Sequence, residues 1–264
     1  MYNYQCVRII DKHHGVSVGE YIHRKTLMRV AIKRIRKTEN KWYHNEIHVL
    51  RELESMDRIP NVIGYEETIR SINIIMEMVD GVRLDYITST RPSLHIRKAL
   101  IRDMCQTMHD VHEKGWIHGD LKMENMILSH MHLSKLPIIK IIDWEFAIQP
   151  HTYRKPYTAG TLTNMPPERL MGQHPDLLDD VWSLGVIIME MITFHHPFDQ
   201  DDDQLLMKQI CEYDIPSLLK LSSQSIQFLT KIFCPRHRRW SLYKLLQHDW
   251  FTTTPKRHHR SLSI

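Results

Sequence analysis

The sequence predicts an α+β fold with two unequal parts, a small, mainly β N-terminal part that contains one helix and a larger, mainly helical C-terminal part. Up to about residue 76 the apolar residues fall in short runs of strand length, interrupted by one helical pattern at 41–55. From Pro92 onward the apolar spacing is mainly that of helices. The Asp80-Gly81 pair between these regions is typical of a turn. We therefore expect the two parts to be joined there.

The elements follow in chain order. Two apolar runs flank the helical pattern in the N-terminal part and predict strands, one at Val30-Ala31-Ile32-Lys33 and one at 72–79. In the C-terminal part the apolar run 136–142 predicts a strand that delivers Asp143. Four segments there have helical periodicity, at 94–114, 176–194, 205–213 and 223–233.

Length and composition fit one globular domain over residues 1–264, with a basic tail at 255–264 that we expect to be solvated. Hydrophobic content of 42% and charged content of 25% are ordinary for such a domain. No apolar run approaches the roughly 18 residues that span a bilayer, so we expect no membrane partner. The N-terminus lacks a secretory signal pattern, and the four cysteines are widely separated. Both features predict reduced thiols and a cytoplasmic or nuclear location.

The densest group of reactive side chains lies at 118–125, His-Gly-Asp-Leu-Lys-Met-Glu-Asn, and Asp143 follows 18 residues after Asn125. Phosphoryl transfer needs such a set. One carboxylate takes the hydroxyl proton, one ammonium neutralises the moving phosphate, and an amide and a second carboxylate hold Mg²⁺. A solvated loop of mixed charge is the alternative for any one of these residues. It is disfavoured because an amphipathic run precedes the loop and apolar strand-like residues follow it.

This pattern resembles the catalytic loop and metal-binding motif of eukaryotic-type protein kinases, H-R-D-x-K-x-x-x-N and D-F-G. Further segments resemble that family in the same order along the chain: Val30-Ala31-Ile32-Lys33, Glu46, Pro166-Pro167-Glu168, Asp180-Val181-Trp182-Ser183-Leu184-Gly185, Arg239 and His248-Asp249-Trp250-Phe251. The resemblance implies the two-lobed protein kinase fold, with an N-lobe at about 1–78 and a C-lobe at about 82–254. It also implies an ATP- and Mg²⁺-dependent kinase.

The resemblance assigns a role to each part of the nucleotide site. Lys33, paired with Glu46, would contact the α- and β-phosphates of ATP, while Asn125 and Asp143 would hold Mg²⁺. Ala31 and Ile127 would sandwich the adenine ring. The rest of the adenine pocket would come from Val18 above the ring, Met76 at the back, and the backbone groups of Glu77 and Met78.

The catalytic residues indicate the serine/threonine branch of the family. Asp120 would accept or orient the hydroxyl proton, and Lys122 would steady the γ-phosphate. Lys122 together with Gly160-Thr161 resembles that branch, in which Thr161 would hydrogen-bond Asp120 and Lys122.

The phosphate-binding loop departs from the family pattern. Counting back from Lys33, three glycines are expected where this chain has Asp11, His13 and Val16. Glycine lets backbone amides approach phosphates closely. Its absence predicts weaker ATP binding or a loop of unusual shape, and it leaves open a catalytically weak pseudokinase that acts as a scaffold.

Two further departures concern regulation. Gly119 replaces the arginine of H-R-D, which in the family receives a phosphate on the activation loop. Glu145 replaces the glycine of D-F-G and should restrict flipping of Asp143. Both favour constitutive activity or control by a partner. The alternative is that neighbouring cations such as Arg154 and Lys155 receive the phosphate instead.

Substrate preference is indicated by acidic residues. The run 199–203 and Glu124 predict protein substrates with basic residues near the target serine or threonine, although such a run is also compatible with a solvated surface. The short length and the missing glycines of the phosphate loop also resemble the small kinases of large DNA viruses such as baculoviruses, which implies an infected host cell and an Arg-rich DNA-condensing substrate. A net charge of +4 is too modest to predict direct nucleic-acid binding. The oligomeric state is left open.

Overall fold

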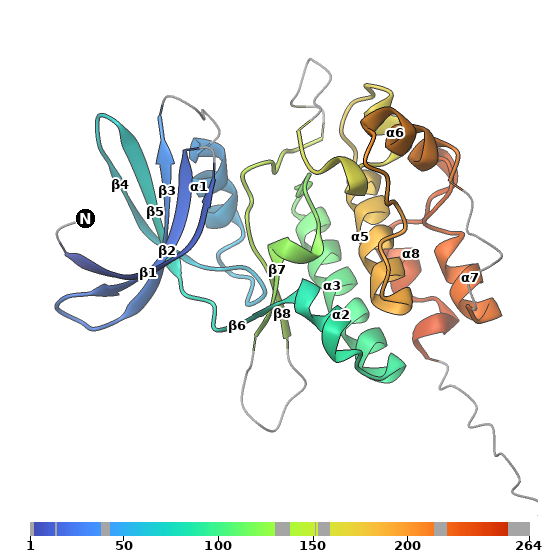
Figure 1. Ribbon diagram of the computed structural model, residues 1–264, viewed down its shortest axis with the longest axis horizontal. Helices are drawn as coiled ribbons and strands as arrows, with labels where there is room; N and C mark the ends of the chain where they lie inside the picture. Colours follow the sequence, from blue (N-terminus) through green and yellow to red (C-terminus); the bar gives the residue numbers. More distant parts are fainter. Residues whose placement is uncertain are drawn as a thin grey trace, which may run out of the picture.

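The computed structural model describes residues 3–13, 15–37, 43–129, 138–150, 152, 159–213 and 221–252. It confirms the predicted fold class, because a mainly β part and a mainly helical part stand side by side (Figure 1). The basic tail at 255–264 lies outside the described residues. The lobe boundaries at 78 and 82 stay a prediction. None of the helices in the described part of the chain combines the length and apolar character that crossing a membrane requires.

The N-terminal part is one antiparallel sheet of five strands with a single helix, α1 (Tyr43–Glu52). The strands are ordered β1-β2-β3-β5-β4. Their bounds are β1 (Tyr4–His13), β2 (Val16–His23), β3 (Arg29–Arg36), β4 (Val62–Glu67) and β5 (Ser71–Glu77). The helix predicted at 41–55 and the strand predicted at 72–79 therefore exist, with ends that differ by a few residues.

The side chains of β3 divide between the two faces of this sheet, as the two-residue period of a strand requires. Val30 and Ile32 pack in a cluster with Tyr21 and Ile75 on one face. On the opposite face Ile35 packs with Ile47 of α1 and with two isoleucines of β5. Lys33 is two residues from Ile35, so it lies on the α1 face.

The C-terminal part is mainly helical, and it begins with a small antiparallel sheet, β6-β7-β8. The strands are β6 (Gly81–Arg83), β7 (Met126–Ser129) and β8 (Ile138–Ile141). The α-helices are α2 (Ile87–Thr90), α3 (Leu94–Glu113), α4 (Pro167–Leu170), α5 (Leu177–Thr193), α6 (Asp203–Cys211), α7 (Ser223–Leu229) and α8 (Leu242–Leu246). Short 3₁₀ turns lie at Leu84–Tyr86, Met123–Asn125, Leu162–Asn164, Arg236–Arg238 and Asp249–Phe251.

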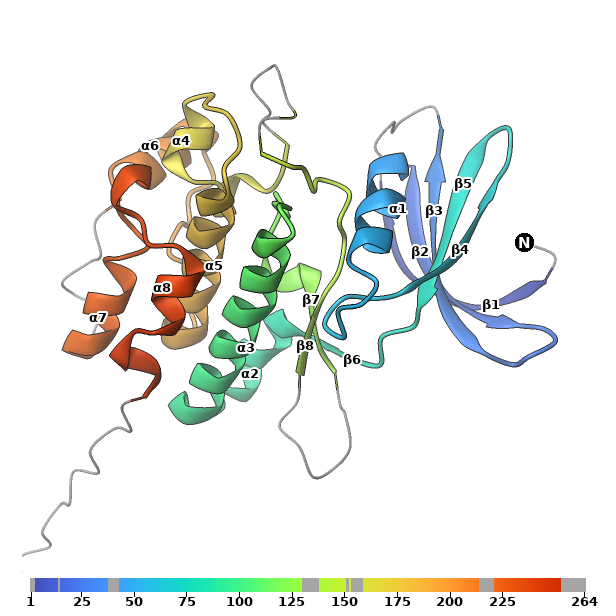
Figure 2. The same ribbon diagram turned by 180° about the vertical axis from the view of Figure 1, so that it is seen from behind.

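The core of this part is built around α3 and α5. Most residues of α5 are buried, and a capping box between Asp176 and Asp179 fixes its N-terminus. The same apolar cluster includes Val49, Leu50 and Leu53 from the end of α1 and just beyond it. In the views from both sides, α1 accordingly lies between the large sheet and the helical part (Figure 2). This apolar cluster therefore joins the N-terminal part to the C-terminal part through α1.

One predicted helix is shorter than expected. The segment predicted at 223–233 is helical only over α7, which ends at Leu229. The chain then turns toward α5 at Gly185, where an added Cβ would lie 2.3 Å from Ile232. Arg239 donates to the carbonyls of Ile232 and Cys234. These contacts stabilise a turn where periodicity alone predicted more helix.

Candidate active site

The loop at 118–125 follows α3 and leads into β7, and a buried carboxylate of α5 holds its beginning. Asp180 Oδ2 accepts the backbone N–H of His118 at 2.8 Å, and Oδ1 accepts that of Gly119 at 3.0 Å. The ring Nε2 of His112 lies 3.0 Å from the same Oδ2. A rigid core helix therefore sets the position of the residue that follows, Asp120.

Asp120 is 4% exposed, and its two carboxylate oxygens have different partners. Oδ1 accepts the backbone N–H of Thr161 at 2.7 Å. Oδ2 lies 2.9 Å from Nζ of Lys122, and Lys122 also donates to Oγ1 of Thr161 at 2.9 Å. The amide nitrogen of Asn125 donates to the Asp120 carbonyl at 3.0 Å and to Oδ2 at 3.3 Å. The structure thus brings together four of the residues proposed for catalysis and metal binding.

Lys33 is the centre of the second cluster. Its Nζ lies 2.9 Å from Oε2 of Glu46, 2.5 Å from Oδ1 of Asp143 and 3.2 Å from Oε2 of Glu145. Burial opposes the charge on this ammonium. The carboxylates outweigh that effect, with Glu46 contributing most, and hold the pKa of Lys33 well above its usual value. Lys33 is therefore a buried cation.

The pKa values of Glu46 and Asp143 in this cluster shift in opposite directions. Burial raises the pKa of Glu46 to about 7, and Asp143 and Glu145 add to the rise while Lys33 opposes it. Burial also acts to raise the pKa of Asp143, but the charge of Lys33 outweighs it and lowers that pKa. At Asp143 the charge of Lys33 therefore outweighs burial, whereas at Glu46 burial outweighs that charge.

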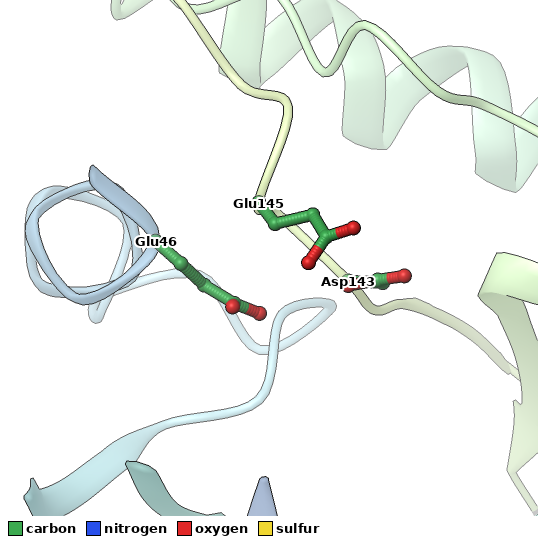
Figure 3. Close-up of side chains that lie close together, drawn as sticks. All are labelled: Glu46, Asp143 and Glu145. Carbon is green, nitrogen blue, oxygen red and sulfur yellow. The ribbon is translucent and has the colours of Figure 1, made fainter. Parts of the chain in front are cut away.

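Glu145 is a site residue that the sequence reasoning missed. The sequence indicated only a lost glycine, but Figure 3 shows the Glu145 carboxylate directed toward those of Glu46 and Asp143. Oxygens of these three side chains lie within 4.8 Å of one another. In this turn the positive φ, 66°, belongs to Asp143 rather than to Glu145, so position 145 does not need a glycine. An acidic residue two positions after Asp143 was the available signal.

The predicted metal ligands have the right chemistry for a hard cation. Asp143 offers carboxylate oxygens, and its side chain is 32% exposed. Asn125 directs its amide nitrogen at Asp120, which leaves its amide oxygen for another partner. Oxygen donors of this kind suit Mg²⁺.

The predicted adenine residues come from two sheets. Val18 pairs with Lys33 across β2 and β3, and Ala31 pairs with Met76 across β3 and β5. Because paired residues share a face of an antiparallel sheet, all four lie on the α1 face. Ile127 lies on β7, between Arg83 of β6 and Lys140 of β8.

The contact of adenine with the backbone carbonyl of Glu77 stays a prediction, and the structure places the Glu77 N–H elsewhere. The N–H of Glu77 donates to the Asn61 carbonyl at 2.9 Å, so that group is not available to adenine. The Glu77 side chain pairs with Lys140. For Met78 the contact with adenine stays a prediction.

The expected phosphate loop is a tight hairpin. His13 pairs with Val16, so only two residues make the turn between β1 and β2, and one of them is Gly15 with a φ of 76°. The carboxylate of Asp11 lies 3.1 Å from Nδ1 of His13. Gly19 lies inside β2 opposite Ile9. Weaker ATP binding, or a loop of unusual shape relative to the family, therefore stays a prediction.

An acidic rim, formed by Asp85, Glu124 and Glu190, adjoins the catalytic loop, and the sequence predicted only Glu124. Burial raises the pKa of Glu190, and the charges of Glu124 and Asp85 add to that rise. The short turns that carry Asp85 and Glu124 contact each other. Glu124 and Asp199 both act to raise the pKa of His196, although burial lowers it overall. Asp199, the first residue of the acidic run at 199–203, therefore acts on the same imidazole as Glu124 of the rim.

The comparisons with known proteins agree with this geometry. The family model of the protein kinase domain matches residues 7–251. The chain is 29% identical over 244 residues to serine/threonine-protein kinase D2 of Rattus norvegicus, covering 86% of this chain and 27% of that protein. It is 31% identical over 239 residues to sperm motility kinase 3A of Mus musculus, covering 87% of this chain and 46% of that protein.

The chain therefore spans about a quarter to a half of the length of these relatives. The family model covers far more than half of the chain, and the described geometry contains the lysine, carboxylates and catalytic loop from which the resemblance was drawn. The chain belongs to the protein kinase family.

Proposed function

We propose that this chain is an active kinase that transfers the γ-phosphate of ATP to serine or threonine hydroxyls of protein substrates. The hydrogen-bond network of Asp120 carries the proposal. Thr161 and Lys122 each bind a different oxygen of that carboxylate, and Lys122 also binds the Thr161 hydroxyl. This arrangement fixes a buried base beside a cation, which a pure scaffold would not require.

The residues divide the work of phosphoryl transfer. Asp120 would orient the substrate hydroxyl and receive its proton, and Lys122 would stabilise negative charge on the transferred group. Lys33 would bind the α- and β-phosphates, and its pairing with Glu46 fixes its position. Asn125 and Asp143 would hold Mg²⁺, which when bound neutralises charge on the phosphates. Most of the catalysis would thus be positioning and electrostatics.

The most direct test measures γ-phosphate transfer to an arginine-rich DNA-condensing protein, with and without Mg²⁺. We expect transfer by the wild type only with Mg²⁺. Asp120→Asn should lose at least about a hundredfold in rate, the lower end of the effect of general base catalysis. Transfer by Asp120→Asn at the wild-type rate would contradict the assignment.

A specific observation favours the second candidate, a catalytically weak scaffold. The hairpin at the phosphate site lacks the expected glycines and carries Asp11. If the wild type binds adenosine yet transfers no phosphate to any basic substrate under the same conditions, the scaffold is the better reading.

We also propose a preference for basic substrates, supported by the acidic rim. Glu124→Gln and Glu190→Gln should each raise the KM for an arginine-containing peptide by about tenfold, because a charge-assisted contact is worth roughly 1.5–3 kcal/mol. The KM for a neutral peptide should stay the same. Asp110→Asn, on the exposed side of α3, is the matched control. Equal changes for both peptides would rule out recognition of basic residues by the rim.

A further inference from the structure

The hydrogen-bonding capacity of Lys33 is fully used in this structure. An ammonium has three N–H donors, and Nζ of Lys33 contacts three separate carboxylates, Glu46, Asp143 and Glu145. Glu46 was expected beside this lysine from the family resemblance, and Asp143 was expected in the same nucleotide site as a ligand of Mg²⁺. Glu145 was not, and it takes the third donor at 3.2 Å.

The same lysine is the proposed ligand of the nucleotide phosphates. A phosphate oxygen can bind Nζ only if one carboxylate releases a donor. Glu46 is 1% exposed on α1, and its contacts with Lys33 anchor the buried pair. Asp143 is more exposed, at 32%, but it makes the shortest contact with Lys33, 2.5 Å. The side chain of Glu145 is 17% exposed and makes the longest of the three contacts, 3.2 Å. Glu145 is therefore the partner that can leave at the lowest cost.

The net charge of the cluster also indicates that Glu145 opposes phosphate binding. The three carboxylates that Figure 3 draws all contact one ammonium, that of Lys33. The phosphates of ATP are anions, so they meet an excess of negative charge that Lys33 alone does not cancel. A carboxylate at position 145 opposes phosphate binding in two ways, because it occupies the donor and it repels the ligand.

We propose that Glu145 is an internal competitor of the nucleotide phosphates for Lys33, a positioning residue that weakens the binding of ATP and ADP relative to adenosine. The inference rests on the proposed function of Lys33 as the phosphate ligand. The backbone does not require Glu145, since the positive φ of the turn lies at Asp143. A substitution at 145 can therefore remove the carboxylate without removing a conformational requirement.

Calorimetric binding of ATP, ADP and adenosine in the presence of Mg²⁺ tests the proposal without depending on turnover. Glu145→Gln keeps the size of the side chain and Glu145→Gly removes it, so the carboxylate is lost in two different ways. Both variants should tighten ATP and ADP by about tenfold, which corresponds to about 1.4 kcal/mol, and should leave adenosine unchanged. Unchanged adenosine affinity also reports that the variant is folded.

The control is Glu67→Gln. Glu67 is a carboxylate of β4 that pairs with Lys37 at 2.5 Å and lacks any contact with Lys33 among the described residues. It should alter none of the three affinities. An equal change for ATP and adenosine in the Glu145 variants, or no change for ATP, would overturn the proposal.

A double variant tests whether Glu145 acts through Lys33. In a Lys33→Met background, Glu145→Gln should tighten ATP by a smaller factor than in the wild type, because the contested donor is gone and only direct repulsion remains. A factor as large as in the wild type would overturn the competition. If the wild type transfers no phosphate but Glu145→Gln still tightens ATP selectively, the inference stands and the proposed function fails.

Discussion

At the scale of single residues, buried carboxylates decide how the catalytic loop and its supports are held. Asp179 of α5 is an example outside the nucleotide site. It is 6% exposed, and this burial raises the pKa of its carboxyl group from 3.8 to about 6, although Arg236 and Arg169 oppose the rise. Because the folded protein holds this proton more tightly than the unfolded chain, the stability that it contributes is complete below pH 3.8 and is lost as pH rises through 6.

Asp179→Asn removes this titration and should change the pH dependence of stability. An asparagine oxygen can still accept the backbone N–H of Asp176, so the helix cap is kept. Relative to the wild type, the unfolding free energy of the variant should improve by up to about 3 kcal/mol between about pH 4 and about pH 6.5. Urea unfolding at both pH values measures this, with Asp110→Asn as the exposed control. A difference that does not vary with pH would show that Asp179 does not titrate in this range.

The sequence predicted residues whose spacing within a motif carries the chemistry. Asp120, Lys122 and Asn125 lie on one loop. Asp120 and Lys122 contact Thr161 as expected, and Asn125 donates to Asp120. The prediction from the sequence missed Glu145, Asp85 and Glu190. Asp85 and Glu190 act electrostatically with Glu124 only because the 3₁₀ turn after β6, helix α5 and the turn before β7 fold together, and no local sequence pattern marks this arrangement.

At the scale of elements, backbone and side-chain contacts hold the first residues of the activation segment, the chain between Asp143 and Glu168, without a phosphate. The Asn45 side chain of α1 donates to the Ala147 carbonyl at 2.5 Å. Ile117 and Ile148 form a two-way backbone bridge at 2.8 and 2.9 Å. Gly119 has a φ of 82°, and a Cβ there would lie 2.7 Å from the Phe146 carbonyl oxygen. An arginine at 119 would therefore not fit without movement.

Activity should accordingly not depend on phosphorylation of the activation segment. A phosphate on this segment would be carried by Thr152, which the structure describes, or by Tyr153, Tyr157 or Thr158. These three residues lie outside the described part of the chain, as do the cations Arg154 and Lys155. Phosphatase-treated protein should keep most of its transfer rate toward a basic protein. A loss of tenfold or more, about 1.4 kcal/mol of barrier, would mean that a phosphate is needed after all.

The hairpin between β1 and β2 should limit the affinity of the protein for the phosphates of ATP. With Asp11, His13 and Val16 in place of glycines, fewer backbone amides can approach the β- and γ-phosphates. Restoring glycine at Asp11 and His13 should tighten ATP severalfold and leave adenosine unchanged, since only ATP carries phosphates. Calorimetry with both ligands checks this. Wild-type ATP affinity at about 1 μM or tighter, the strong end for enzyme substrates, would show that the hairpin binds phosphate by another route.

Element types were predictable from periodicity, and element ends were less so. The helices at α3 and α5 lie within a residue or two of their predicted ranges. The predicted end of α7 was wrong because the chain after Leu229 is set by a tertiary contact, the close approach of Ile232 to Gly185. The two-residue turn between β1 and β2 was also not predictable from the sequence, because strand pairing rather than composition sets its length.

At the scale of the whole molecule, the site exists only where the two parts meet. Lys33 comes from the large sheet, Glu46 from α1, and Asp143 from the loop after β8. Asp120 comes from the loop before β7, which α5 holds. The packing of α1 against the C-terminal core joins these segments. Transfer of phosphate should therefore require residues from both parts at once.

The measurement that tests this most directly is the initial rate of γ-phosphate transfer by Lys33→Met, with Lys37→Met as control. Lys37 is also a lysine in an ion pair at the N-terminal sheet, but its partner is Glu67. We expect background transfer for Lys33→Met and an unchanged rate for Lys37→Met, with both proteins folded by circular dichroism. A folded Lys33→Met protein that transfers phosphate at the wild-type rate would contradict the assignment of this site.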